Sequence, residues 1–224
     1  MRRRNGRIDG AMPGAAETRP PTARAARLTV RELTSPLAGP FDLELAPGEA
    51  AAISGPSGSG KSLFLRMVAD LDPNTGQVAL DGAARETMSP TDWRRRAPYV
   101  AAESGWWCDG VAEHFSPDRL AAARELGAEV GLAAELFDGP VLRLSTGEKQ
   151  RLAIIRALVL DPPALLLDEP TAPLDPDSTR QMETILRRRL RGGLSLVVVT
   201  HDAHQAKRLG ARHYLMRDRK MSPA

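Results

Sequence analysis

The segment that most constrains this chain is a glycine-rich stretch between an apolar run and a helical pattern. It reads Gly55-Pro56-Ser57-Gly58-Ser59-Gly60-Lys61-Ser62 and fits the pattern G-x-x-x-x-G-K-[ST]. Residues 50–54 before it are typical of a short buried strand, and residues 63–68 after it are typical of the first turns of a helix. The glycines let the backbone turn tightly, so successive N–H groups and the helix N-terminus form a nest for anionic oxygens. Strand, loop and helix together predict a phosphate-binding loop.

Two residues at the end of this loop carry the expected chemistry. Lys61 can reach the β- and γ-phosphates of a nucleoside triphosphate, and the Ser62 hydroxyl can ligate Mg²⁺. The alternative is a glycine-rich turn that matches the pattern by chance. All four fixed positions occur in the context that the motif requires, which disfavours this alternative. We therefore expect the loop to bind a nucleoside triphosphate, with Mg²⁺ as the cofactor.

The composition indicates one globular domain without a disulfide framework. The 224 residues can form one sizeable core, and the formal net charge of +3 is too small to indicate a nucleic-acid partner. The one cysteine, Cys108, excludes an intramolecular disulfide and suits a reducing compartment. No apolar run approaches the roughly 18 residues that cross a bilayer, so we expect a soluble, cytoplasmic chain. Residues 1–27 are basic and rich in Pro and Ala, and we expect a disordered tail there.

Apolar runs that alternate with helical patterns predict an α/β domain. Strand patterns occur near residues 28–30, 41–45, 50–54, 77–82, 99–101, 164–167, 194–200 and 213–216, and we expect the last of these to be the final strand. Helical patterns begin at 63 and 90 and cover 111–137, 152–160, 176–191 and 202–209. A loop is expected over residues 35–40. Because strands alternate with helices, the sheet is predicted to be mainly parallel.

Two consecutive acids follow one of the most apolar predicted strands. Residues 165–167 are all leucine, and Asp168 and Glu169 come next. A strand that ends in an acid can aim its carboxylate at Mg²⁺ beside the phosphate loop, and Glu169 can position or deprotonate an attacking water. The alternative, a solvated turn, is disfavoured after so apolar a strand with Lys61 upstream. We expect Asp168 to be a metal ligand and Glu169 to act on the water.

Three further segments complete a recognisable order of motifs. They read Leu144-Ser145-Thr146-Gly147-Glu148, Ala172-Pro173-Leu174-Asp175 and Thr200-His201-Asp202. With the phosphate loop and the acid pair, this order resembles the nucleotide-binding subunit of an ATP-binding cassette (ABC) transporter. In that family the three segments correspond to the signature (usually LSGGQ), the D-loop (usually SALD) and the switch histidine. The resemblance covers residues 28–216.

The resemblance implies both an architecture and an activity. The fold would be a P-loop NTPase with a mainly parallel central sheet, an antiparallel β region at the N-terminal side and a small helical subdomain at about 103–150, within one domain at 28–224. The chain would hydrolyse ATP and drive a separate integral-membrane permease through ATP-dependent dimerisation with an identical or similar cassette. It would lie on the cytoplasmic face of the inner or plasma membrane. A non-transport ABC ATPase that signals or transmits force through a membrane partner stays open.

The resemblance also implies roles for individual residues. Ser145, Thr146, Gly147 and Glu148 would contact ATP held by the opposite subunit, because a helix that starts there offers a second anion site. An ordinary capping box explains Ser145 and Glu148 but leaves the rest of the signature unexplained. Asp175 would act in the D-loop, and His201 would sense the γ-phosphate. Three other histidines lack such a context and are expected to be structural or solvated, namely His114, His204 and His213.

Two positions depart from the family pattern. Ala102 stands where the family usually has a glutamine that touches Mg²⁺ and water, and Glu103 could substitute after a shift of one residue. Leu37 stands where an aromatic residue often stacks on adenine, so we expect adenine to rest on an aliphatic surface. Neither change removes a phosphate, metal or base contact, so hydrolysis is still expected. A degenerate binding module is disfavoured for the same reason.

Trp106 and Trp107 follow the altered glutamine segment. In the family this region receives a coupling helix from the membrane subunit, and two large aromatic side chains would make a suitable docking patch. The alternative is that both are buried within the helical subdomain, as tryptophan is highly buried on average. Both interpretations remain open at this point.

Overall fold

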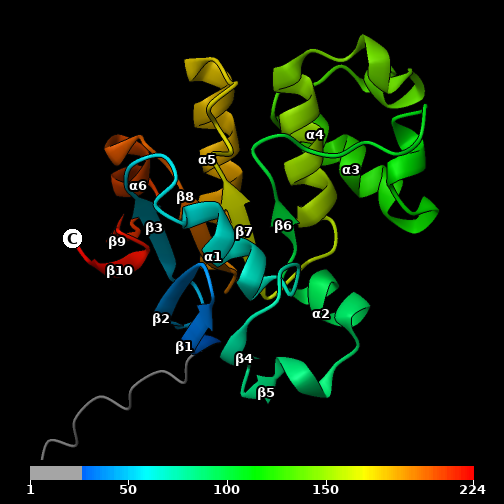
Figure 1. The fold of residues 1–224 in the computed structure, drawn as a ribbon. Helices are drawn as coiled ribbons and strands as arrows, with labels where there is room; N and C mark the ends of the chain where they lie inside the picture. Colours follow the sequence, from blue (N-terminus) through cyan, green and yellow to red (C-terminus); the bar gives the residue numbers. More distant parts are fainter. Residues whose placement is uncertain (1–26) are drawn as a thin grey trace, which may run out of the picture.

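The fold is seen in a computed structural model that describes residues 27–224 (Figure 1). The expectation of a disordered tail therefore lies, apart from Arg27, outside the described residues. Within them no helix is both long and apolar enough to cross a membrane.

The N-terminal part forms a four-stranded antiparallel sheet in the order β2-β1-β4-β5. Its strands are β1 (Leu28–Ser35), β2 (Ala38–Leu45), β4 (Thr75–Leu80) and β5 (Ala83–Ala84). The loop predicted over residues 35–40 is shorter in the structure. β1 and β2 pair as far as Ser35 and Ala38, so only Pro36 and Leu37 form a tight turn. This turn presents Leu37 at the tip of a hairpin.

A second sheet of six strands carries the predicted parallel arrangement, in the order β10-β9-β3-β8-β7-β6. Its strands are β3 (Ala50–Ser54), β6 (Tyr99–Val100), β7 (Ala164–Asp168), β8 (Ser195–Val199), β9 (Arg212–Arg217) and β10 (Lys220–Pro223). All neighbours pair in parallel except β9 and β10, which form an antiparallel hairpin. The expectation that the strand near 213–216 is the last one is wrong. No Asn-Gly or Asp-Gly pair marked the turn, which is Asp218-Arg219.

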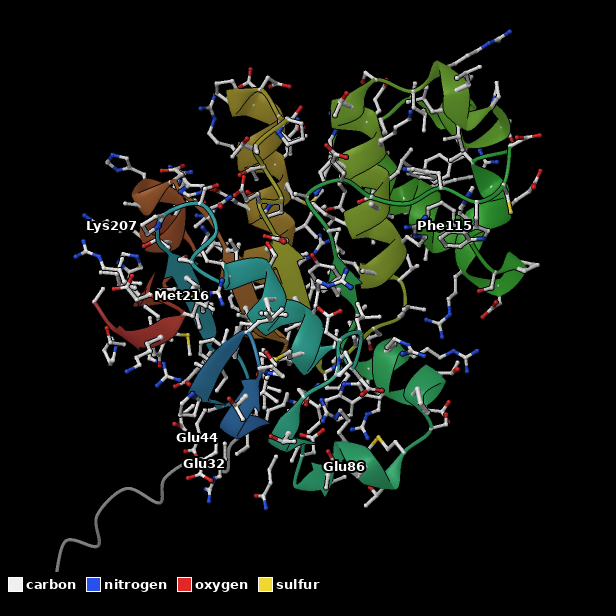
Figure 2. The ribbon with its side chains drawn as sticks, in the orientation of Figure 1. Glu32, Glu44, Glu86, Phe115, Lys207 and Met216 are labelled. Carbon is white, nitrogen blue, oxygen red and sulfur yellow. The ribbon has the colours of Figure 1, made fainter. Side chains whose placement is uncertain are left out.

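The central parallel strands β7 and β8 are buried on both faces, which explains their continuous apolar sequences. Alternate residues point to opposite faces and join different clusters of buried side chains. One cluster takes Ile53, Leu166 and Val197 together with Phe64 of α1 (Lys61–Val68) and Trp93 of α2 (Pro90–Arg96). On the opposite face the sheet packs against α4 (Thr146–Leu158), α5 (Pro176–Arg191) and α6 (Ala203–Arg208). Figure 2 shows the side chains that fill the space between these layers.

A helical region follows β6 and returns to the sheet through α4 (Figure 1). The helical pattern predicted over 111–137 is only partly correct. The structure has α3 (Pro117–Glu129) between the 3-10 helices η2 (Ala112–His114) and η3 (Ala134–Asp138), and η4 (Val141–Arg143) follows. The chain turns at Gly131, whose φ of +71° ends the helical run. A further 3-10 helix, η1 (Arg85–Thr87), lies between β5 and α2.

Candidate functional site

The phosphate loop joins β3 to α1 and is shaped by close backbone packing. Gly55 has a φ of +152°, and a Cβ atom added there would lie 2.1 Å from the carbonyl oxygen of Met216 on β9. Gly58 and Gly60 also have positive φ, at +75° and +105°. The buried Lys61 donates through Nζ to the carbonyl oxygens of Gly55 and Pro56, at 2.8 and 2.9 Å. Its ammonium group is therefore held over the loop, where a phosphate would bind.

A cavity of about 320 Å³ opens beside this loop. It is lined by Leu37, Ser57, Gly58, Gly60, Lys61, Ser62, Leu63, Glu169 and Arg219. The structure thus brings Leu37, Glu169 and five of the predicted loop residues to one place, while Gly55, Pro56 and Ser59 are not among the described residues that line this cavity. Arg219 was not predicted. It lies in the β9–β10 turn, which no sequence pattern marks.

Asp168 ends β7 and points its carboxylate into a nearly closed environment, with 5% of the residue exposed. The hydroxyl of Tyr99 donates to Oδ2 of Asp168 at 3.0 Å. Burial first, and then the neighbouring Asp168 charge, raise the pKa of Tyr99, so the phenol stays a donor. No local sequence pattern points to Tyr99, because its contact depends on β6 pairing beside β7. Asp168 and Ser62 offer the hard oxygen donors that Mg²⁺ prefers, so the residues fit this metal.

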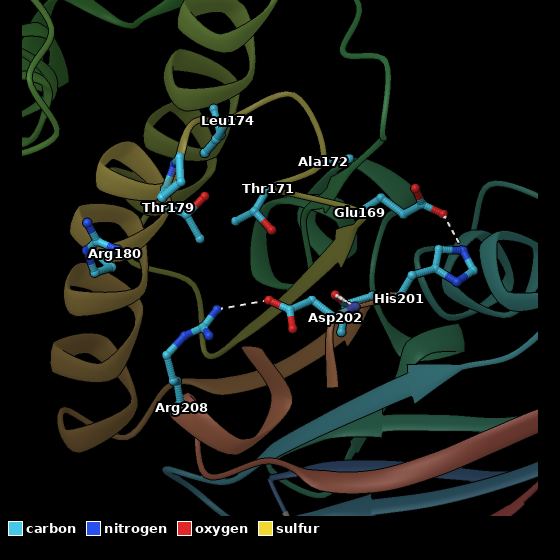
Figure 3. A pocket seen from close by; sticks show the side chains of 11 residues that line it. Glu169, Thr171, Ala172, Leu174, Thr179, Arg180, His201, Asp202 and Arg208 are labelled. Carbon is cyan, nitrogen blue, oxygen red and sulfur yellow. Dashed lines mark hydrogen bonds and ion pairs between the residues drawn. The ribbon is translucent and has the colours of Figure 1, made fainter. Parts of the chain in front are cut away.

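Glu169 and His201 meet where β7 and β8 end (Figure 3). The His201 Nε2 atom lies 3.1 Å from Oε1 of Glu169. Glu169 has a φ of +46°, an uncommon conformation for a residue other than glycine, and its N–H donates to the carbonyl of Val199. These two predicted residues are therefore in direct contact. The backbone at Glu169 turns the acid out of the strand toward the phosphate loop.

A second cavity of about 550 Å³ extends from Glu169 and His201 toward α5 and α6 (Figure 3). Asp202 caps α6 by accepting from the His204 N–H, and it also accepts from Arg208 at 3.0 Å. Arg208 in turn donates two hydrogen bonds, of 2.6 and 2.8 Å, to Glu183 on α5. The Arg208–Glu183 ion pair holds α6 against α5, and with α6 the preceding segment that carries His201.

The signature begins α4 and does not line the cavity beside the phosphate loop. Ser145 caps the helix, because its hydroxyl accepts from the Glu148 N–H and the Glu148 carboxylate accepts from the Ser145 N–H. A Cβ atom added at Gly147 would lie 3.2 Å from the carbonyl oxygen of Pro173. The tip of the signature helix therefore packs closely on the D-loop of the same chain. Thr146 is exposed beside it.

Asp175 caps α5 and connects the D-loop to the helical region. It accepts from the Asp177 and Ser178 N–H groups at 2.9 Å each. The hydrogen bond from the Ser178 hydroxyl is the main reason why the pKa of Asp175 falls to about 2. The same hydroxyl accepts from Arg151 of α4 at 2.9 Å. Arg151 also donates to the Val130 carbonyl at 2.9 Å, next to the end of α3.

The segment that departs from the family pattern lies outside the cavity. Neither Ala102 nor Glu103 is among the described residues that line it, and both are exposed. Buried Gln150 of α4 fixes this segment instead, by accepting from the Ser104 hydroxyl at 3.2 Å and donating to the Ala101 carbonyl at 3.4 Å. The substitution of Glu103 for the missing glutamine has no support in this arrangement.

The two adjacent tryptophans have different environments. Trp106 is partly buried against the core, whereas Trp107 is 69% exposed. The Arg156 guanidinium lies over both rings, 5.0 and 4.6 Å from their centroids. His114 is buried below them and accepts from the Trp107 and Cys108 N–H groups. The core interpretation therefore fits Trp106, and the surface interpretation fits Trp107.

Comparison with known proteins identifies the family of this chain. The family model described as "ABC transporter" matches residues 39–172, which is more than half of the chain. The chain is 41% identical to the cobalt import ATP-binding protein CbiO of Rhodobacter capsulatus, over 79% of this chain and 69% of the relative. It is 40% identical to the aliphatic sulfonates import ATP-binding protein SsuB of Ralstonia nicotianae, over 80% of this chain but 63% of that relative, just under two thirds of its length. It is 35% identical to the lipoprotein-releasing system ATP-binding protein LolD 1 of Rhodopirellula baltica, over 84% and 89%.

Solved structures share the fold. A dimeric structure of a post-hydrolysis state of the ATP-binding cassette MJ0796, bound to ADP and Pi, has a TM-score of 0.75 at 22% identity, over 88% of this chain and 98% of that one. A bacterial Atm1-family ABC exporter with ATP bound has the same TM-score at 24% identity, over 90% and 40%. The expected P-loop NTPase fold is confirmed. The chain belongs to the ABC transporter family, as an ATP-binding ATPase subunit.

Proposed function

We propose that this chain binds and hydrolyses ATP as one of two cassettes that close on two nucleotides and drive a separate membrane permease. The observation that carries the proposal is the cavity where the phosphate loop meets Glu169, with the signature helix outside it. A signature that does not reach its own phosphate loop is available to a second cassette. The partner cassette is either a second copy of this chain or a similar one.

Residues at the ends of β3, β7 and β8 have different roles at the phosphates. The phosphate loop binds the triphosphate through its backbone N–H groups, and Lys61 leaves its carbonyl partners to neutralise the β- and γ-phosphates. Ser62 and Asp168 would hold Mg²⁺, which would neutralise charge that develops on the phosphates. Tyr99 fixes one oxygen of Asp168. Glu169 takes the proton of the attacking water, and His201, 3.1 Å away, orients this carboxylate and contacts the γ-phosphate.

The signature completes the site of the other cassette. The N–H groups of the first turn of α4 offer partial positive charge to the γ-phosphate of the opposite subunit. Ser145 and Glu148 stabilise this helix start through their capping box. Gly147 allows the D-loop to pack against it, so Asp175 and the signature reach the partner together.

Glu169→Gln tests the hydrolysis step. We expect phosphate release to fall by about 10²- to 10⁴-fold, because the general base is lost, while ATP binding remains. Under saturating Mg-ATP this variant should accumulate as a dimer, measured by light scattering after size exclusion. Glu135→Gln, which removes an exposed acid in the helical region, serves as a control and should behave as the parent chain. A Glu169→Gln protein that still turns over ATP, or that stays monomeric with ATP bound, would contradict the proposal.

We propose that the permease docks over Trp107, at the cytoplasmic face of the membrane. Trp107 is exposed, large and rigid, and Arg156 and His114 hold its ring in place. Trp107→Ala should weaken co-purification with the permease at least about tenfold while the affinity for ATP is unchanged. Trp106→Ala, the matched variant, should instead lower the free energy of unfolding. An equal loss of stability in both variants would favour a purely structural role for Trp107.

The relatives import cobalt or sulfonates or release lipoproteins, so the proposal names transport without a particular solute. The second candidate is a cassette that transmits force or a signal through its membrane partner. ATPase activity measured in liposomes with the partner separates the two. Stimulation by a solute that accumulates across the membrane supports transport, and stimulation without any accumulated solute supports the second candidate.

A further inference from the structure

The cavity beside the phosphate loop has a cationic side chain that none of the roles above uses. Arg219 lines it from the β9–β10 turn, and Leu37, which is distant in the sequence, lines it from the β1–β2 turn. The Arg219 guanidinium donates to the carbonyl oxygen of Leu37 at 2.9 Å, and the Arg219 carbonyl accepts from the Gly39 N–H at 3.1 Å. The two hairpin turns are therefore joined directly above the loop.

The backbone at Arg219 makes this placement costly. The two residues between β9 and β10, Asp218 and Arg219, have φ values of +46° and +61°. A two-residue turn with positive φ at both positions favours glycine at the second, and a side chain there costs stability. An arginine that keeps this conformation while its side chain reaches a ligand cavity points to a role in binding.

The position of the cavity lining indicates which part of the nucleotide is near Arg219. Lys61, Ser62 and the loop N–H groups account for the triphosphate, and Glu169 for the water beside the γ-phosphate. Leu37 and Arg219 are the two lining residues that belong neither to the phosphate loop and the start of α1 nor to the segment of Glu169. They are left to contact the nucleoside.

Resting on the proposed function, we infer that the Arg219 guanidinium stacks on the nucleobase and replaces the aromatic ring that this cavity lacks. The N–H groups of a guanidinium donate in its plane, so the hydrogen bond to Leu37 occupies neither face, and Arg219 is exposed. A flat cation against a purine is a favourable cation–π contact, and Leu37, 58% exposed, covers the neighbouring edge. None of the acids in the described residues forms a salt bridge with Arg219 that would compete. Adenine therefore rests on arginine as well as on leucine.

Arg219→Gly gives a direct test, because glycine suits the turn and removes only the side chain. We expect its urea midpoint to equal or exceed that of the parent chain, while the Kd for Mg-ADP, measured by calorimetry, rises about 3- to 30-fold. The Kd for Mg-pyrophosphate, which has no base, should not change. Arg219→Lys keeps the positive charge but replaces the planar guanidinium by an ammonium group, so it should recover little of the ADP affinity. Arg217→Ala, which removes one charge from the same hairpin outside the cavity, should bind both ligands normally.

The outcomes separate the inference from the function on which it rests. If pyrophosphate binding weakens as much as ADP binding, or if lysine restores ADP affinity fully, Arg219 contacts phosphate and the stacking inference is wrong. Unchanged ADP affinity in Arg219→Gly also overturns it. A parent chain that binds neither ADP nor pyrophosphate would instead refute the proposed function.

Discussion

Replacing Tyr99 by phenylalanine removes the hydroxyl that donates to Asp168 and leaves the half-buried ring in place. The Asp168 carboxylate is almost inaccessible to water, so the lost donor is not replaced by solvent. A hydrogen bond to a charged group contributes about 1.5–3 kcal/mol to stability. With a urea m-value of about 2 kcal/mol/M, the midpoint should fall by about 1 M. Tyr214→Phe, the same change at the other tyrosine, is the control, because no described side chain hydrogen-bonds to its hydroxyl.

A double-mutant cycle assigns this loss to the contact itself. Asp168→Asn and Tyr99→Phe, made singly and together, should show a coupling free energy of about 1.5–3 kcal/mol. Because Tyr99 also fixes an oxygen of the proposed metal ligand, Tyr99→Phe should raise the Mg²⁺ concentration needed for half-maximal ATPase activity. A midpoint shift no larger than that of Tyr214→Phe, with a coupling near zero, would refute the reasoning.

Three further predictions concern other contacts. Arg208→Met leaves the Glu183 carboxylate, 1% exposed, without its cation and should cost about 3 kcal/mol in urea unfolding, and adding Glu183→Gln should recover most of it. Gly55→Ala should abolish Mg-ADP binding in calorimetry, because its Cβ would overlap a β9 carbonyl. The folded pKa of Asp175, about 2, lies below its unfolded value of about 3.9, so its stabilisation is complete above about pH 4 and lost as the pH falls toward 2. Asp175→Asn should flatten this acid limb of an unfolding titration.

Local signals explain what could be predicted from the sequence. Gly55 to Ser62 form a loop whose backbone demands glycine at fixed places, and Asp168 ends a strand that is apolar throughout. The helices expected from residues 90 and 176 do begin there, because Ser89 and Asp175 cap them and each is followed by a proline, which is a strong local start signal. Such features depend on neighbouring residues alone.

Contacts between distant segments explain what could not. Tyr99 reaches Asp168 only because β6 pairs with β7, and no pattern within either strand reveals that pairing. Arg219 reaches the cavity through a turn that lacks the usual glycine. Trp106 and Trp107 are identical neighbours that both contact Arg156 and His114, and only the packing of Trp106 against the core distinguishes the partly buried ring from the exposed one.

Arg151 ties α4 to two neighbouring elements. Its bond to the Val130 carbonyl ties α4 to the end of α3, whereas its bond to the Ser178 hydroxyl ties α4 to α5. If α3 and α4 swing as one piece, the bond to Ser178 has to be exchanged together with the two hydrogen bonds from Arg188 of α5 to Glu129 of α3. If α4 slides alone, both bonds of Arg151 must break. Either movement breaks the bond to Ser178, so a push applied at Trp107 would reach Asp175 of the D-loop through this hydroxyl as well as through the packing of Gly147 on Pro173.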